Sequence, residues 1–307
     1  MTNKIYNDIH GWLIIDKPLH STSAQVVHQV KKKFNKIKVG HAGTLDPLAT
    51  GVLPLALGEA TKSVQYIMAE RKKYRFEVTW GASRTTDDLE GDIINFSDQR
   101  PKLIEIQHIL KDFQGEILQS PPSYSALKIQ GKRACDLMRQ EKSVTLNPRQ
   151  VMIYDLKLLS QLSNDRCLFE VDCGKGTYVR ALARDMGEKL GCFGYASLID
   201  RLSVGSFEKK QALTLEMLAS LDKNILLKEY VKKVQDVLDD IPAVLVSDHE
   251  AEDLRKGRTI PVTSLGLGLE QNQLQLCIDN NHNVVAFVRV KDERLHPERV
   301  FNILTKG

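Results

Sequence analysis

The stretch Lys72-Lys73-Tyr74-Arg75-Phe76-Glu77-Val78-Thr79-Trp80-Gly81 has the clearest strand pattern in this 307-residue chain. Large apolar side chains alternate with polar ones, with Tyr74, Phe76, Val78 and Trp80 on one side and Arg75, Glu77 and Thr79 on the other. A period of two places the apolar set on one face of a sheet and the polar set on the opposite face. The stretch therefore predicts a half-buried strand in an antiparallel sheet.

Strands and helices are predicted in irregular order on both sides of this stretch. Extended segments are expected at Gly11–Lys17, Tyr124–Ile129, Gln150–Leu159 and Arg166–Asp172. Helices are expected after an N-cap at Ser23, from a first helical position at Pro101, and over Thr177–Leu190, with a loop rich in glycine and proline over Gly40–Pro54. A doubly wound parallel sheet would need regular alternation. The order predicts an α+β fold with a mixed, mainly antiparallel sheet and flanking helices.

The length of the chain suggests about two domains, at roughly 150 residues per domain. The pattern becomes helical and charged over Lys209–Asp240, and a new strand-like segment starts at Ile241. Two further strands are expected at Gln273–Ile278 and Asn283–Val290, joined by a polar turn. We therefore expect a catalytic domain over residues 1–240 and a small β-rich module over residues 241–307.

The composition excludes several classes of protein. It is 42% hydrophobic and 27% charged, which is typical of a globular protein rather than a disordered or repetitive one. The apolar run Trp12–Ile15 is too short for a signal sequence or a membrane span. The five cysteines are scattered and contain no CxxC pair, so neither a disulfide framework nor a zinc site is indicated. We expect a cytoplasmic protein with no membrane contact.

Positive charge is concentrated in the N-terminal half. Residues 1–76 contain 12 Lys and Arg against 5 Asp and Glu, whereas residues 241–307 contain 8 against 9. Three basic clusters lie within residues 31–38, 71–75 and 128–142. One such cluster is usually a solvated face, but three that are interleaved with aromatic residues favour a polyanionic partner.

The loop that starts at Gly40 contains the most unusual residues. Its glycines resemble a phosphate cradle, but no Gly-Lys-Ser/Thr follows, which argues against a nucleoside triphosphate site. Asp46 stands beside Pro47 in an otherwise apolar loop. An isolated Asp-Pro is most often a helix cap or an Asx-turn, but a partly buried carboxylate also suits nucleophilic or base catalysis.

The sequence of this loop closely resembles the catalytic-loop signature of the tRNA pseudouridine synthase B family, in the stretch GHAGTLDPLATGVL at residues 40–53. That family isomerises uridine-55 in the T-loop of tRNA. Further blocks resemble the family in the same order, at residues 16–18 with 21–23, 72–75, 121–128 with 131–134, and 174–180 with 182–187. The resemblance covers roughly residues 11–210. It is weak beyond Ile241, where bacterial members carry a small RNA-binding module of the PUA type.

The resemblance implies a reaction centre of three residues. Asp46 would be the reacting carboxylate, either as a nucleophile at the sugar or the base, or as the base that removes the C2′ proton in a glycal route. Arg180 would be the cation that keeps this carboxylate ionised in an apolar pocket. Tyr74 would stack on the flipped uracil and handle a proton at C5, although a tyrosine in an alternating strand is more often a core residue.

Four more residues are implied to contact the substrate. Tyr178 would stack on the uracil, and His41 would fill space beside the extruded nucleotide. Lys17 and Lys128 would contact phosphate or order the site. No metal and no organic cofactor is implied. The implied partner is the T-arm of tRNA, with no protein partner and a monomeric enzyme.

Several positions depart from the family pattern. His20 replaces a usual glycine, Arg84-Thr85-Thr86 followed by Asp87 and Asp88 replaces Thr-Asp-Thr before a further Asp, Asp200 replaces an arginine and Cys135 an aromatic residue. These departures concern substrate contacts and leave the catalytic loop intact.

Three alternatives remain open at this stage. The first is a synthase of the same fold with another RNA substrate. The second is an RNA-folding chaperone, which has no need of a buried aspartate. The third is a metal-independent glycosidase, which is disfavoured because no second carboxylate motif is found.

Overall fold

Residues 72–80 form β4 (Lys72–Trp80), which lies in the middle of a nine-stranded sheet in a computed structural model of the chain. The structure describes all residues except 1–8, 141–143, 145, 239, 263–269 and 304–307. The neighbours of β4 are β11 (Arg166–Cys173) and β12 (Gly194–Val204), and both run antiparallel to it. The predicted antiparallel strand is confirmed. Its apolar face is buried, and Glu77 on the opposite face is buried as well.

The large sheet is mixed and mainly antiparallel, as predicted. Its main path runs β1-β3-β12-β4-β11-β10-β7, with β2 paired to β3 and β13 paired to β12. The pair β3 and β12 is the parallel pairing in this sheet. The remaining strands of the sheet are β1 (Gly11–Lys17), β2 (Val39–His41), β3 (Ala49–Leu57), β7 (Gly115–Gln119), β10 (Arg149–Gln161) and β13 (Phe207–Glu208).

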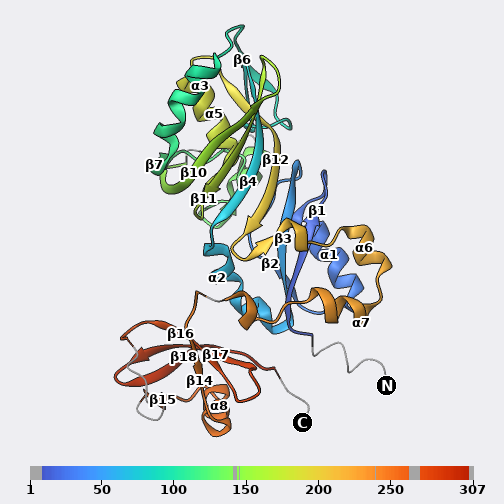
Figure 1. The fold of residues 1–307 in the computed structure, drawn as a ribbon, viewed down its shortest axis with the longest axis vertical. Helices are drawn as coiled ribbons and strands as arrows, with labels where there is room; N and C mark the ends of the chain where they lie inside the picture. The colour runs from blue at the N-terminus through green and yellow to red at the C-terminus, as the bar shows by residue number, and fades with distance from the viewer. Residues whose placement is uncertain (1–8, 141–143, 145, 239, 263–269, 304–307) are drawn as a thin grey trace.

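Helices cover the two halves of this elongated sheet (Figure 1). The helices α3 (Leu103–Ile109) and α5 (Val179–Lys189) lie on the half that contains β4, β11 and β10, and α5 packs on β12 and β4. The other half carries α1 (Ser23–Lys33), α6 (Leu215–Ser220) and α7 (Lys223–Ile225), with α2 (Val64–Ala69) leading into β4. Two small hairpins project from the sheet, β5 (Ala82–Arg84) with β6 (Ile93–Phe96), and β8 (Lys128–Ile129) with β9 (Lys132–Arg133), which leads into α4 (Ala134–Met138).

A second sheet is formed by the C-terminal part of the chain. Its order is β14-β16-β17-β18-β15, and α8 (Asp248–Arg255) packs on it. The strands are β14 (Ala243–Leu245), β15 (Ile260–Pro261), β16 (Leu274–Ile278), β17 (Val284–Lys291) and β18 (Arg294–Val300). The two strands predicted here are thus confirmed as β16 and β17. The sheet shares an apolar cluster with the N-terminal part, where the ring centroids of Phe287 and Tyr66 lie 4.3 Å apart.

The first helix begins one residue differently from the prediction. Thr22, not Ser23, is its N-cap, because Thr22 has extended backbone angles and its hydroxyl accepts a hydrogen bond from the amide of Gln25. The Gln25 side chain in turn accepts from the amide of Thr22, which completes a capping box. Ser23 is therefore free to make a different contact, with the loop between β2 and β3.

Three other predicted elements also differ from the structure. Pro101 is not a first helical residue, because the Glu105 carboxylate accepts from the amide of Lys102 and α3 starts at Leu103. The strand expected at Tyr124–Ile129 is reduced to β8, since carbonyls in this segment accept hydrogen bonds from residues 134 and 135 and from an arginine. The loop expected over Gly40–Pro54 shrinks to residues 42–48, because β2 pairs with β3 across it.

Candidate active site

Asp46 lies on the short loop between β2 and β3, and this loop is fastened on both sides of it. The Ser23 hydroxyl accepts from the amide of Leu45 at 2.9 Å and donates to the carbonyl of Leu45 at 3.1 Å. The Lys17 ammonium donates to the carbonyl of Pro47 at 3.3 Å. The Asp46 side chain itself is 41% exposed. The fold thus holds the backbone of Asp46 while leaving its carboxylate accessible.

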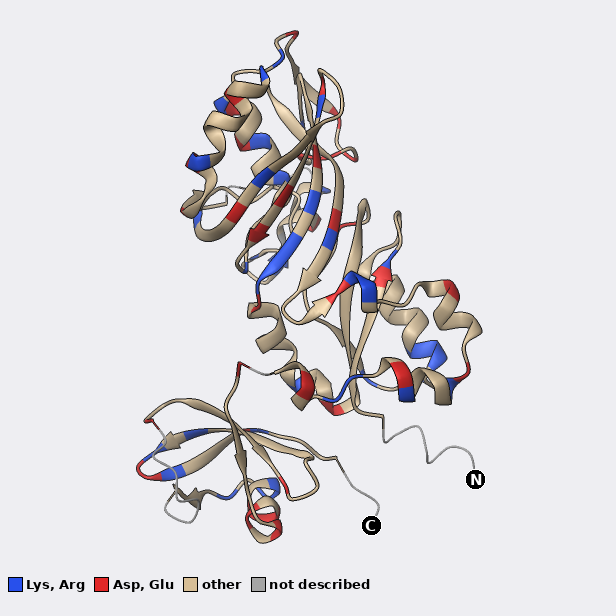
Figure 2. Ribbon diagram, viewed as in Figure 1, with Lys and Arg blue, Asp and Glu red and all other residues tan. Residues whose placement is uncertain are grey.

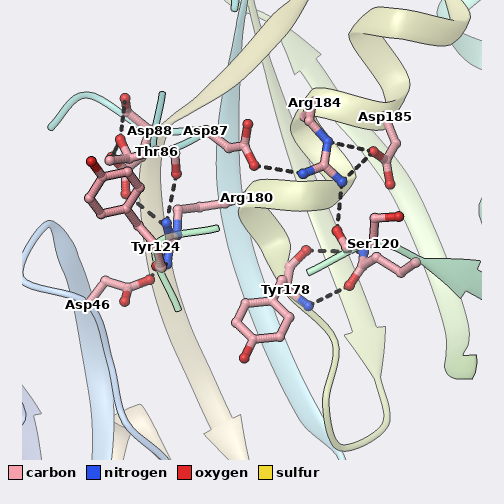
Figure 3. Close-up of polar contacts among 11 residues, drawn as sticks. Asp46, Thr86, Asp87, Asp88, Ser120, Tyr124, Tyr178, Arg180, Arg184 and Asp185 are labelled. Atoms are coloured by element: carbon pink, nitrogen blue, oxygen red, sulfur yellow. Dashed lines mark hydrogen bonds and ion pairs between the residues drawn. The ribbon is translucent and has the colours of Figure 1, made fainter. Parts of the chain in front are cut away.

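Arg180 projects from the second residue of α5 toward Asp46, as the resemblance implied (Figure 3). Its Nε lies 3.0 Å from Asp46 Oδ2, and its side chain is only 4% exposed. The two terminal nitrogens are used elsewhere: Nη1 donates to the carbonyl of Thr86 at 2.7 Å and Nη2 to that of Tyr124 at 3.0 Å. Backbone contacts on two loops therefore fix the guanidinium beside Asp46.

A second carboxylate shares this guanidinium. Asp88 Oδ2 lies 3.5 Å from Nε of Arg180, and Asp88 Oδ1 accepts from the Thr86 hydroxyl at 2.5 Å and from the amide of Glu90 at 3.0 Å. Burial by itself would lower the pKa of Arg180, but the nearby carboxylates, Asp46 first, raise it above its usual value. Arg180 therefore remains a cation.

Another arginine of the same helix holds the neighbouring aspartate. Arg184 donates to Asp87 Oδ2 at 2.8 Å, to the carbonyl of Ser120 at 2.7 Å and to Asp185 Oδ1 at 2.8 Å (Figure 3). Burial raises the pKa of Asp87 to about 6, although Arg184 and Arg180 act in the opposite direction. The segment that departs from the family pattern thus supplies one carboxylate to each arginine.

Asp46 and Arg180 line a cavity of about 290 Å³. Its wall combines apolar side chains with buried cations. It is lined by Gly43, Thr44, Leu45, Asp46, Ala49, Met68, Lys72, Tyr74, Ala126, Leu127, Gly176, Thr177, Tyr178, Val179, Arg180, Ile199 and Arg201. Both predicted tyrosines, Tyr74 and Tyr178, are present in the wall. Burial raises the pKa of each, so both hydroxyls stay protonated near neutral pH.

Tyr178 is held through its backbone at the start of α5. The Gln119 side chain accepts from the amide of Tyr178 at 2.8 Å and donates to its carbonyl at 3.2 Å. Gln119 is itself buried at the end of β7. One amide side chain therefore fixes the residue that precedes the helix of Arg180.

Arg201 was missed by the sequence analysis, although it is fully buried and lines the cavity. It donates from Nε to the carbonyl of Val52 at 2.7 Å and from Nη2 to the carbonyl of Gly43 at 3.0 Å. Gly43 has a φ of +92°, and a Cβ there would lie 3.3 Å from Arg201 Nη1. The one sequence signal for this residue was its place directly after Asp200, a position that departs from the family pattern.

Lys72 and Asp88 were also not assigned to the site from sequence. The Lys72 ammonium, near the cavity wall, donates to the carbonyl of Met68 at 2.9 Å and to that of Glu70. Burial lowers the pKa of Lys72 to about 8. No local pattern distinguishes these two residues, because each is defined by partners that the fold brings close.

The other predicted residues lie outside the cavity wall. Lys17 is fully buried and donates to three carbonyls, those of Pro18, Ser21 and Pro47, at 2.9, 2.6 and 3.3 Å. Burial lowers its pKa to about 8. This placement favours the ordering role of Lys17 over a phosphate contact.

His41 and Lys128 occupy different positions. His41 ends β2, and burial followed by the charge of Arg201 lowers its pKa, which favours the neutral ring. Lys128 is exposed on β8. It directly follows Ala126 and Leu127, which are two of the residues that line the cavity. The Lys128 side chain is therefore accessible to solvent.

Two general features of the site concern metals and membranes. Within the part of the chain that the structure describes, no group of three or more His, Cys, Asp or Glu side chains is arranged to hold a metal ion. Among the same residues, no helix has the length and apolar character needed to cross a membrane.

Comparison with known proteins now identifies the family. The model of the TruB family pseudouridylate synthases, N-terminal domain, matches residues 31–179. A tRNA pseudouridine synthase B of Agrobacterium fabrum is 44% identical over 300 residues, which cover 95% of each chain. The chain belongs to the TruB family of pseudouridylate synthases. As a member of this family it is an isomerase that acts on uridine in RNA.

Other members of the TruB family match over a similar extent. The tRNA pseudouridine synthases B of Bradyrhizobium diazoefficiens and of Caulobacter sp. strain K31 are each 43% identical, over 96% of this chain and 87% and 97% of theirs. Among solved structures, a Cbf5-Nop10-Gar1 complex superposes with a TM-score of 0.74 at 24% identity, over 97% of this chain and 86% of that one. An H/ACA RNP bound to a substrate RNA containing 2′-deoxyuridine gives 0.73 at 22%, over 98% and 87%. The similarity to these two structures supports the fold described above.

Proposed function

We propose that this chain converts the uridine at position 55, in the T-loop of tRNA, to pseudouridine in the cytoplasm, with Asp46 as the reacting carboxylate and without a metal or an organic cofactor. The observation that carries this proposal is the contact of Asp46 Oδ2 with the buried Nε of Arg180, 3.0 Å away, at a cavity of about 290 Å³. Ligand pockets commonly measure roughly 300–1,000 Å³. A cavity at the lower end of that range suits a single flipped base.

The reaction places clear demands on the site. The bond between N1 of the uracil and C1′ of the ribose breaks, the detached base turns over, and C5 bonds to C1′. C5 then loses its proton and N1 takes one up, so the product is an isomer of uridine. Asp46 can attack the sugar or the base, or can remove the C2′ proton, and each route starts from the ionised carboxylate. A fixed cation at 3.0 Å favours that ionised form.

The other residues of the family pattern take supporting roles. Tyr74 and Tyr178, in the wall of the cavity, would stack on the uracil, and the Tyr74 hydroxyl would handle the C5 proton. His41, held neutral by burial, would fill space beside the extruded nucleotide. Lys17 would order the loop of Asp46 through the carbonyl of Pro47. Lys128, exposed near the cavity, would contact a phosphate of the RNA.

The target uridine must leave the folded T-arm before it can reach Asp46, which costs a few kcal/mol of unstacking. The exposed fraction of Asp46, 41%, is consistent with a pocket that stays open until the base enters and excludes water. Lys and Arg are distributed over several segments of the N-terminal part rather than on one element (Figure 2). We propose that these residues hold the T-arm and that the enzyme acts as a monomer. We further propose that residues 241–307 form an accessory RNA-binding module of the PUA type.

The proposal is tested by tritium release from tRNA that carries [5-³H]uridine. The wild-type chain should release tritium from position 55, and Asp46→Asn should bind the same tRNA but release none. Asp112→Asn is a matched control, since Asp112 is also 41% exposed and pairs with a basic residue, Lys189, at 3.2 Å. It should retain full activity. Substantial turnover by Asp46→Asn would contradict the role of Asp46 as the reacting carboxylate. Tritium release from another RNA but not from tRNA would contradict the assignment of tRNA as the substrate.

A further inference from the structure

We propose that Arg201 is a second catalytic cation, which stabilises the negative charge on the uracil while the base is detached from the ribose. This inference rests on the proposed function and extends it to a residue outside the seven that the resemblance implies for the site. The inference is based on a comparison of the two buried arginines that line the cavity, because one is paired with carboxylates and the other is not.

The two guanidinium groups differ in their counter-charges. Arg180 has two carboxylates within 4 Å, those of Asp46 and Asp88. Arg201 is 1% exposed, and among the described residues no carboxylate forms an ion pair with it. Its hydrogen bonds go to neutral groups, namely the carbonyls of Val52 and Gly43 and the side chain of Tyr74. A buried cation without a counter-ion is costly, which indicates that the site gains from it at another stage of the reaction.

The chemistry supplies that stage. In the direct nucleophilic route, Asp46 bonds to C1′ and becomes a neutral ester, while the electron pair of the broken C1′–N1 bond stays on the uracil. In the glycal route, Asp46 takes the C2′ proton and becomes a neutral acid, and the same electron pair leaves with the base. If Asp46 instead adds to C6, the ring takes up the charge on O4. In all three routes one negative charge moves from Asp46 to the uracil.

The position of Arg201 fits the place where this charge arrives. Arg201 on β12 is the direct cross-strand partner of Tyr74 on β4, and both side chains line the cavity, together with Ile199. The charge of Arg201 acts on this wall, since it lowers the pKa of Lys72 and opposes the rise in the pKa of Tyr74. Its two carbonyl contacts also fix the guanidinium before the reaction, so little reorganisation is needed when the charge develops.

Arg201 also holds the loop of Asp46 through Gly43, so the experiment must separate a charge effect from a positioning effect. A T-arm stem-loop is prepared with either uridine or 5-fluorouridine at position 55, and loss of the target nucleoside is followed by chromatography of nuclease digests under single-turnover conditions. The electron-withdrawing fluorine stabilises the detached base by itself. A neutral variant of Arg201 should therefore be less damaging for the fluorinated substrate.

Removal of one preorganised donor that faces developing charge costs roughly 10²–10³ in rate, so Arg201→Gln should lose about that factor on uridine and clearly less on 5-fluorouridine. Arg201→Met provides a second neutral variant in case Arg201→Gln does not fold, because an apolar side chain removes the cost of burying a charge. Arg201→Lys keeps the cation but replaces the planar guanidinium, whose Nε and Nη2 donate to the two carbonyls, by a single nitrogen. It should lose the same factor on both substrates.

Ser23→Ala is the matched control for loop positioning, because Ser23 holds Leu45 and does not line the cavity. It should also lose an equal factor on both substrates. The inference is overturned if a folded neutral variant of Arg201 loses equal factors on uridine and 5-fluorouridine, as Ser23→Ala does. Failure of the proposed function would look different, since the wild-type chain would then convert neither stem-loop.

Discussion

The hydroxyl of Ser23 holds the peptide groups on both sides of Leu45, the residue directly before Asp46. It accepts from the amide at 2.9 Å and donates to the carbonyl at 3.1 Å, across 22 residues of sequence. This side chain therefore fastens the loop of Asp46 to the start of α1.

Replacement of Ser23 by Ala should lower kcat much more than it weakens tRNA binding. The variant leaves both Leu45 groups unsatisfied, at a cost of about 1–3 kcal/mol, and a shift of the loop by about 1 Å can cost up to 10²-fold in rate. Single-turnover tritium release measures the effect. Thr22→Ala is the control, since it removes the helix cap, worth about 1 kcal/mol, without a contact to the loop. Equal kcat in the two variants would contradict the positioning role.

Gln119 should be required for the placement of Tyr178. Gln119→Glu can still accept from the amide of Tyr178, but it cannot donate to the carbonyl and would bury a carboxylate beside it. We expect a loss of roughly 1–3 kcal/mol in unfolding free energy, measured by urea denaturation, and a reduced kcat. Gln114→Glu is the control. The Gln114 side chain also donates to a backbone carbonyl, that of Leu156, and its replacement should leave kcat unchanged. Unaltered kcat in Gln119→Glu would show that Tyr178 does not depend on this contact.

Asp87 should give the protein a pH-dependent stability. Burial raises its folded pKa from 3.8 to about 6, so between about pH 4 and 6 the folded state binds a proton that the unfolded state has released. The unfolding free energy contributed by Asp87 therefore falls as pH rises through this window, by up to about 3 kcal/mol. The difference in stability between wild type and Asp87→Asn, measured by urea denaturation at each pH, should fall accordingly. A difference that is constant from pH 4 to 7 would contradict this prediction.

The lysines in the last turn of α1, Lys31, Lys32 and Lys33, should divide into two groups. Lys33 donates to the carbonyls of Ala219 and Leu221, 2.9 and 2.6 Å away, and so caps α6. Lys33→Gln should lower stability and leave the salt dependence of tRNA binding unchanged. Lys31→Gln with Lys32→Gln should reduce the slope of log affinity against log salt by about 0.7–0.9 for each phosphate that the protein no longer neutralises. An unchanged slope in the double variant would show that Lys31 and Lys32 face solvent and do not contact RNA.

Phe287 should couple the C-terminal sheet to the rest of the chain. Its ring is fully buried and lies 4.3 Å from that of Tyr66 and 5.4 Å from that of Phe301. Phe287→Ala should cost about 3–5 kcal/mol and should weaken tRNA binding while kcat at saturating tRNA is retained. Phe169→Ala, an equally buried ring in β11 that lies outside the cluster shared with the C-terminal sheet, is the control that should lower stability without a specific loss of affinity. Equal affinities in the two variants would contradict a binding role for this sheet.

The local sequence predicted several of the elements, but it did not predict β12 or most of β3. The contact at the centre of the site was implied by the family resemblance. The alternation in residues 72–81 predicted β4, because a period of two is a property of one strand alone. The blocks around Asp46 and Arg180 predicted a pair that the structure brings to 3.0 Å. The errors at Ser23 and Tyr124–Ile129 occur where a backbone group finds its hydrogen-bond partner outside the expected element. The helix expected from Pro101 starts later because Glu105, within the helix, accepts from the amide of Lys102.

Only the tertiary structure decided what the buried polar side chains do. Lys17, which the sequence marks as basic, is fully buried and directs its charge to backbone carbonyls. The half-buried Lys33 directs its charge to the carbonyls of Ala219 and Leu221. Arg201 reaches the cavity because β12 lies between β3 and β4, and its carbonyl partners are 149 and 158 residues away in the chain. Residue type and spacing report on neighbours within a turn or a strand, whereas the partners of a buried cation depend on which distant strands pack together.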